Sequence, residues 1–89
     1  LNKMKTHWKF ADYIEVDKEF KIEGLNIWNH YWNCSDRKIE VIGPRTGNPY
    51  LFNEYEIKTP EKTIIFIVGE FSEGKIGLYL PVENAILHK

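Results

Sequence analysis

Apolar and polar residues alternate with a period of two over most of the chain, and turn residues interrupt this pattern at short intervals. Such a pattern is typical of β-strands joined in hairpins. The first two alternating runs are 13–16 and 20–23, with Asp17-Lys18-Glu19 between them. We expect these two runs to pair as a hairpin, although no glycine supplies the positive φ that tight hairpin turns favour.

The clearest hairpin signal lies between residues 50 and 71. Two strand-like runs, 50–58 and 63–71, flank Thr59-Pro60-Glu61-Lys62, where Pro60 fits the second position of a type I turn. The run 64–68 is apolar at every position and rich in β-branched residues, which favours a central strand covered on both faces. After a turn at 72–75, the run 76–80 completes a three-strand meander that ends at Pro81.

Other parts of the chain give weaker signals. Residues 38–42 alternate like a strand, and residues 43–49 contain two glycines and two prolines, which favours a surface loop. Residues 8–10 fit a further strand, while the tail 81–89 fits either a short helix or an edge strand.

The segment 24–36 carries mixed signals. Leu25, Trp28 and Trp32 have helical spacing, and Asn26 suits an N-cap. The other Asn and Asp residues and the aromatic side chains have low helix propensity. We therefore expect an extended start that leads into an aromatic loop or a single helical turn.

About six short strands in 89 residues predict a single small all-β domain over residues 1–89, with at most one short helix. We expect a meander that forms either a strongly bent antiparallel sheet or a small barrel of SH3-like size. The pattern does not separate an open barrel from a two-layer sandwich.

Composition narrows the function classes. Aromatic residues make up 15% of the chain, enough to let a short sequence bury a core. Twelve basic and thirteen acidic residues give a net charge of -1 with no basic stretch, so we expect no nucleic-acid binding. The longest apolar run, 64–68, is too short to span a bilayer, and the N-terminal residues lack an apolar signal segment, so we expect no membrane association.

Candidates for catalysis or metal binding are few. Cys34 is the single cysteine, which excludes an intramolecular disulfide and favours a cytoplasmic setting. His30 and Cys34 are four residues apart, but zinc requires three or four ligands, so we expect no metal, no cofactor and no enzyme activity. Cys34 is expected to be a small buried side chain. Outward strand positions are expected for the carboxylates Glu15, Glu40, Glu54 and Glu56.

Three functions compete at this stage. The first is a small non-enzymatic domain that binds another protein, or a second copy of itself, through the aromatic segment and the Gly/Pro loop. The second is a small-ligand or carbohydrate-binding domain that uses exposed Trp and Tyr rings. The third is a small enzyme or enzyme subunit whose site is completed by oligomerisation. The candidate binding residues are Trp28, His30, Tyr31, Trp32, Arg45 and Tyr50. Core packing competes with ligand contact for both tryptophans, whereas His30 and Tyr31 are expected at the surface.

Overall fold

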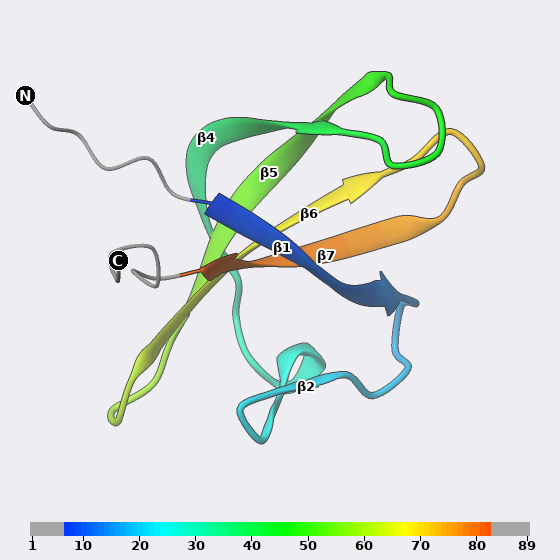
Figure 1. Cartoon of the computed structure of the whole chain (residues 1–89). Helices are drawn as coiled ribbons and strands as arrows, with labels where there is room; N and C mark the ends of the chain where they lie inside the picture. The colour runs from blue at the N-terminus through cyan, green and yellow to red at the C-terminus, as the bar shows by residue number, and fades with distance from the viewer. Residues whose placement is uncertain (1–6, 83–89) are drawn as a thin grey trace, which may run out of the picture.

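Five antiparallel strands form the main sheet of the computed structural model, which describes residues 7–82 (Figure 1). These strands are β1 (His7–Ile14), β4 (Asn33–Ile42), β5 (Pro49–Lys58), β6 (Thr63–Glu70) and β7 (Ile76–Val82). Their order across the sheet is β1-β7-β6-β5-β4. A small hairpin of β2 (Lys21–Ile22) and β3 (Leu25–Asn26), followed by the 3-10 turn η1 (Ile27–Asn29), lies beside this sheet.

The prediction of an all-β antiparallel fold is confirmed. The strands β4, β5, β6 and β7 are neighbours in chain order, so the meander is confirmed as well. Of the predicted architectures, the closed barrel is wrong, because β1 and β4 lie at the two edges of the described sheet and do not pair with each other. The result is an open, twisted sheet (Figure 1).

The hairpin predicted around Pro60 is confirmed. β5 pairs with β6 from Asn53 opposite Val68 to Lys58 opposite Thr63. In the turn, the Thr59 N–H donates to the Lys62 carbonyl oxygen over 2.9 Å, and the Lys62 N–H donates to Thr59 Oγ1 over 3.1 Å. Side-chain and backbone bonds therefore close the same turn.

The run 64–68 lies in β6, the central strand of the sheet, as predicted. Ile64, Phe66 and Ile67 are buried, but Ile65 is 37% exposed. The expectation that this strand is covered on both faces therefore holds at Ile67 and is wrong at Ile65.

The predicted first hairpin is wrong. β1 ends at Ile14 and pairs with β7, whereas β2 pairs with β3. Ile14 is buried opposite Ile76, but Val16 lies beyond the strand and is 66% exposed. Period-two alternation identifies a strand but carries no information about its partner, and β7 supplies a longer partner than the two residues of β2.

The segment 24–36 confirms the expected extended start followed by a single helical turn. Asn26 is its N-cap, and Asn26 Oδ1 accepts from the Trp28 N–H over 3.3 Å and from the Phe20 N–H over 3.2 Å. The chain becomes extended again at Asn33, so β4 starts five residues before the predicted strand at 38. Residues 8–10 lie in β1, as predicted, and most of the predicted tail, 83–89, lies outside the described residues.

The main sheet has two different faces. The face that we call the covered face packs against β2, β3 and η1, and its buried cluster is Ile14, Ile22, Ile27, Ile57, Ile64, Phe66 and Leu78. The opposite face, which we call the aromatic face, has a smaller buried cluster of Val41, Phe52, Ile67 and Tyr79. Each such side chain contributes about 1.5–3 kcal/mol by leaving water.

Within residues 7–82, no helix has the length and apolar character needed to cross a bilayer.

Candidate functional site

The two tryptophans of the predicted aromatic segment pack inward. Trp28 and Trp32 stack with ring centroids 5.2 Å apart, and both contact the cluster on the covered face. Trp32 Nε1 donates to the Ile27 carbonyl oxygen over 2.8 Å, whereas the buried Trp28 Nε1 has no hydrogen-bond partner among the described residues. Core packing is therefore the role that the structure gives both rings. His30 and Tyr31 are exposed as expected, Tyr31 to 79%.

Two expectations about polar side chains are wrong. Cys34 is exposed rather than buried, because it lies on the edge strand β4 beside a register shift between Cys34 and Lys38. Glu54 is 9% exposed rather than outward-facing. The irregular stretch of β4 brings polar groups over it, and Glu54 Oε1 accepts from Ser35 Oγ over 2.7 Å and lies 3.7 Å from Arg37 Nε.

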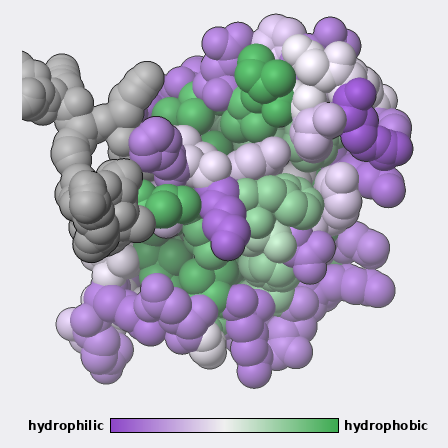
Figure 2. Space-filling view, viewed as in Figure 1, coloured by the Kyte–Doolittle hydropathy of each residue, from purple (hydrophilic) through white to green (hydrophobic). Residues whose placement is uncertain are grey.

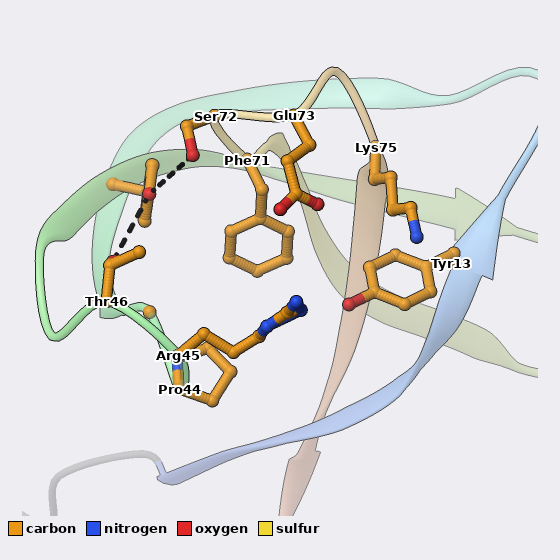
Figure 3. Close-up of a pocket in the computed structure, with 10 residues that line it drawn as sticks. Tyr13, Pro44, Arg45, Thr46, Phe71, Ser72, Glu73 and Lys75 are labelled. Carbon is orange, nitrogen blue, oxygen red and sulfur yellow. Dashed lines mark hydrogen bonds between the residues drawn. The ribbon is translucent and has the colours of Figure 1, made fainter.

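Arg45 and Tyr50, the other two predicted residues, meet in a pocket at one end of the aromatic face (Figure 3). We call it the Arg45 pocket. The loop 43–48, the turn 71–75 and the end of β1 surround it. Its volume available to water-sized groups is about 30 Å³. The lining residues are Tyr13, Gly43, Pro44, Arg45, Thr46, Tyr50, Phe71, Ser72, Glu73 and Lys75.

Glycines let aromatic rings lie close to the backbone around this pocket. Gly69 and Gly77 are directly opposite each other on β6 and β7. A Cβ at Gly69 would overlap the Phe52 ring, and one at Gly77 would lie 2.7 Å from Phe71 Cε2. Neither position has room for a Cβ, so the two glycines are required for this ring packing.

A third glycine has the same role in the loop. A Cβ at Gly43 would lie 2.7 Å from Tyr50 Cε2. The Gly43 N–H also donates to the Asn48 carbonyl oxygen over 2.8 Å, and the Gly47 N–H donates to the Gly43 carbonyl oxygen over 2.9 Å. These bonds fix the loop that carries Arg45.

The rings themselves form a closed circuit of edge-to-face contacts. Centroid distances are 5.1 Å for Tyr13–Phe10, 5.4 Å for Phe10–Tyr79, 5.4 Å for Tyr79–Phe52, 5.5 Å for Phe52–Phe71 and 6.3 Å for Phe71–Tyr13. Such contacts stabilise by about 0.5–1.5 kcal/mol each beyond the area that they bury. The circuit therefore holds Tyr13 and Phe71 in fixed positions at the pocket.

Part of this aromatic surface faces solvent. Phe10 is 41% and Tyr13 is 43% exposed. On the side of the molecule drawn in Figure 2, apolar patches lie between hydrophilic residues.

The polar groups of the pocket are a hydroxyl chain and three charges. The Tyr50 hydroxyl donates to Ser72 Oγ over 3.2 Å and lies 3.4 Å from Thr46 Oγ1. Hydrogen bonding, first with Ser72 and then with Thr46, lowers the pKa of Tyr50 below its ordinary value of 10.0. The Tyr50 hydroxyl is therefore anchored to both loops that border the pocket.

Two cations and one carboxylate border the pocket. Lys75 Nζ lies 5.1 Å from the Tyr13 ring centroid, and Arg45 extends from its loop into the pocket toward Tyr13 (Figure 3). Glu73 reaches in from the opposite turn. In the part of the chain from 7 to 82, neither Arg45 nor Lys75 lies within 4.0 Å of a carboxylate oxygen.

Sequence reasoning missed most of this pocket, including Tyr13, Phe71 and Lys75. The signal that could have indicated it is the pair Gly69 and Gly77, since glycine inside an otherwise strong strand marks a close approach of another group. Finding which ring approaches requires the strand register.

The fold and the site together define a small open antiparallel sheet with an aromatic pocket bordered by cations. No set of three His, Cys, Asp or Glu side chains within 7–82 is placed to hold a metal ion. Comparison with known proteins finds no matching family model, no significantly similar curated protein and no significantly similar solved structure.

Proposed function

We propose that this chain is a non-enzymatic domain that binds an acidic segment of another protein in the Arg45 pocket. The observation that carries this proposal is that Arg45 and Lys75 border a wall of aromatic rings without a carboxylate partner among residues 7–82. Tyrosine, phenylalanine and arginine are the residue types that contribute most at protein interfaces.

Two cations, Arg45 and Lys75, against one carboxylate, Glu73, give the pocket a net positive charge, which favours an anionic partner over a cationic one. Lys75 already lies over Tyr13, and Arg45 already extends toward the same ring, so the chain's own cations occupy the positions that a cationic ligand would take. A guanidinium group binds a carboxylate through two parallel hydrogen bonds. A partner segment with an Asp or Glu side chain at Arg45 and an apolar neighbour against Tyr13 would match both the cations and the aromatic rings of the pocket.

The size of the Arg45 pocket argues against a small-substrate site at this place. Sites for small substrates usually enclose about 300–1,000 Å³. The Arg45 pocket offers about 30 Å³, which suits one side-chain group of a larger partner. The stacked tryptophans give no comparable support to carbohydrate binding, since Trp28 and Trp32 cover one face of each other's ring.

The exposed thiol of Cys34 supports a cytoplasmic setting as part of the same proposal. Reducing compartments maintain free thiols, whereas an exposed free thiol is exposed to oxidation in secretory compartments.

Selection from a random peptide display library tests the proposed function. We expect the wild-type chain to enrich peptides that contain Asp or Glu next to an apolar residue. The double variant Arg45→Glu with Lys75→Glu reverses the charge of the pocket and is expected to lose these peptides. Both side chains are exposed, so the variant should fold.

The control variant is Tyr31→Ala, which removes the most exposed aromatic ring of the other predicted binding segment. It should enrich the same peptides as the wild type. Enrichment that is independent of Asp and Glu, or that survives reversal of both pocket charges, would overturn the proposal.

A further inference from the structure

We propose that the edge strand β4 binds a second copy of the chain, with the two β4 strands antiparallel and Ile39 at the two-fold axis. This inference does not depend on the Arg45 pocket, which lies on different residues. The proposed dimer rests on one observation: on the exposed edge strand β4, Lys38 and Glu40 flank Ile39.

The edge of β4 is available for pairing. Among the described strands, β4 pairs with β5 alone and lies at the margin of the sheet (Figure 1). An edge strand presents a row of N–H and C=O groups that can pair with another chain. The register shift between Cys34 and Lys38 makes the first half of β4 irregular, whereas residues 38–42 pair regularly with β5. Within this regular half, an axis through Ile39 opposes residues 38–40 of the two copies, so these three residues are the part that accepts the further strand.

Among the axes through Lys38, Ile39 and Glu40, the charges select the one through Ile39. Lys38 and Glu40 are both exposed, and they point to the same face because they are two residues apart. A two-fold axis perpendicular to the sheet through Ile39 places each Lys38 opposite Glu40 of the other copy. An axis through Lys38 would oppose two lysines, and an axis through Glu40 would oppose two glutamates. Opposite charges stabilise cross-strand pairs and like charges destabilise them.

The apolar side chains fit the same register. Ile39 is half-buried and packs against the cluster of the aromatic face. On the axis it meets Ile39 of the second copy. Only three residues of the regular stretch, 38–40, oppose one another in this register, so the interface is small, and interfaces of this size are typically weak and transient.

Sedimentation velocity over a range of concentrations tests the pairing. We expect the wild-type chain to pass from the mass of one chain to twice that mass as its concentration rises toward about 1 mM, in keeping with a weak interface. Lys38→Glu and Glu40→Lys each create two like-charge pairs, and each is expected to weaken the dimer by roughly tenfold or more.

Mixing the two variants gives the sharpest result. Lys38→Glu and Glu40→Lys should each be mostly monomeric alone, but an equimolar mixture should form a heterodimer, because every opposed pair then has opposite charges. The doubly exchanged chain, Lys38→Glu with Glu40→Lys, should again form a homodimer. Lys9→Glu, which reverses an exposed charge on the other edge strand, is the matched control and should dimerise like the wild type.

A chain that stays monomeric at about 1 mM would overturn the proposal, and so would a dimer that both single variants leave unchanged. Failure of the mixed variants to associate would also overturn it, because the register centred on Ile39 requires that rescue.

Discussion

The two faces of the sheet differ in how their apolar side chains are covered. On the covered face, β2, β3 and η1 pack against the sheet and place Ile22 and Ile27 over its strands. On the aromatic face, Tyr50 and Phe71 pack against the buried cluster that includes Phe52 and Ile67, whereas Phe10 and Tyr13 stay partly exposed. One face therefore mainly stabilises the fold, and the other is the face on which we propose that a partner binds.

The largest expected effect is on the covered face. Phe66 is fully buried there at the centre of the sheet, so Phe66→Ala should lower the free energy of unfolding by about 3–5 kcal/mol. Urea denaturation followed by circular dichroism measures this loss.

The neighbouring residue is the matched control. Ile65 points to the opposite face and is 37% exposed, so Ile65→Ala should cost only about 1 kcal/mol. Equal losses for Phe66→Ala and Ile65→Ala would contradict the division of β6 into a covered and a partly open face.

On the aromatic face, the glycine packing predicts a loss of intermediate size. Gly69→Ala places a methyl group in the space of the Phe52 ring and should destabilise the chain by about 1–3 kcal/mol. In a Phe52→Leu background the same substitution should cost less, because the smaller side chain leaves room. Additive losses in this double-mutant cycle would show that the ring does not restrict Gly69.

The sequence predicts local elements of this fold better than it predicts their pairing. The hairpin around Pro60 was predictable because the turn residues and both strands are contiguous. The pairing of β1 with β7 was not, since Ile14 and Ile76 are distant in sequence and alternation does not specify a partner.

In the candidate site, too, local features were predictable and contacts between distant segments were not. Arg45 was predicted because it stands in a loop of glycines and prolines, where a charged side chain is exposed. Tyr13 and Phe71 come from segments that meet only once the sheet has formed, so no local pattern places them beside Arg45. The exposed position of Cys34 was missed for a related reason, because β-bulges and edge positions depend on the register.

Removing the pocket cation should have a small effect on stability. Arg45 is exposed and forms no ion pair within residues 7–82, so Arg45→Ala should change the free energy of unfolding by about 0.5 kcal/mol or less. Thermal or urea denaturation measures this change. A loss near that of Gly69→Ala would mean that Arg45 stabilises the fold rather than a complex.

The smallest expected effect is a pH dependence at alkaline pH. Burial, followed by the nearby Tyr13, raises the pKa of Tyr79 above its ordinary value of 10.0. The folded chain therefore keeps this proton longer than the unfolded chain, and the contribution of Tyr79 to stability is present below about pH 10 and is lost as the pH rises through the folded-state pKa.

Urea denaturation of the wild type and of Tyr79→Phe, at pH 9 and at pH 11, measures this dependence. The variant should lose less stability between the two pH values than the wild type does. An equal or larger loss in the variant would contradict the assignment of a raised pKa to Tyr79.

The central claim is that the aromatic face, and not the aromatic segment around Tyr31, is where a partner binds. It is tested most directly by recording amide chemical shifts of the ¹⁵N-labelled chain during titration with an acidic peptide enriched by the wild type. We expect the largest shifts at Tyr13, in the loop 43–48 and in the turn 71–75. Shifts confined to residues 28–32, with the loop that carries Arg45 unchanged, would contradict the claim.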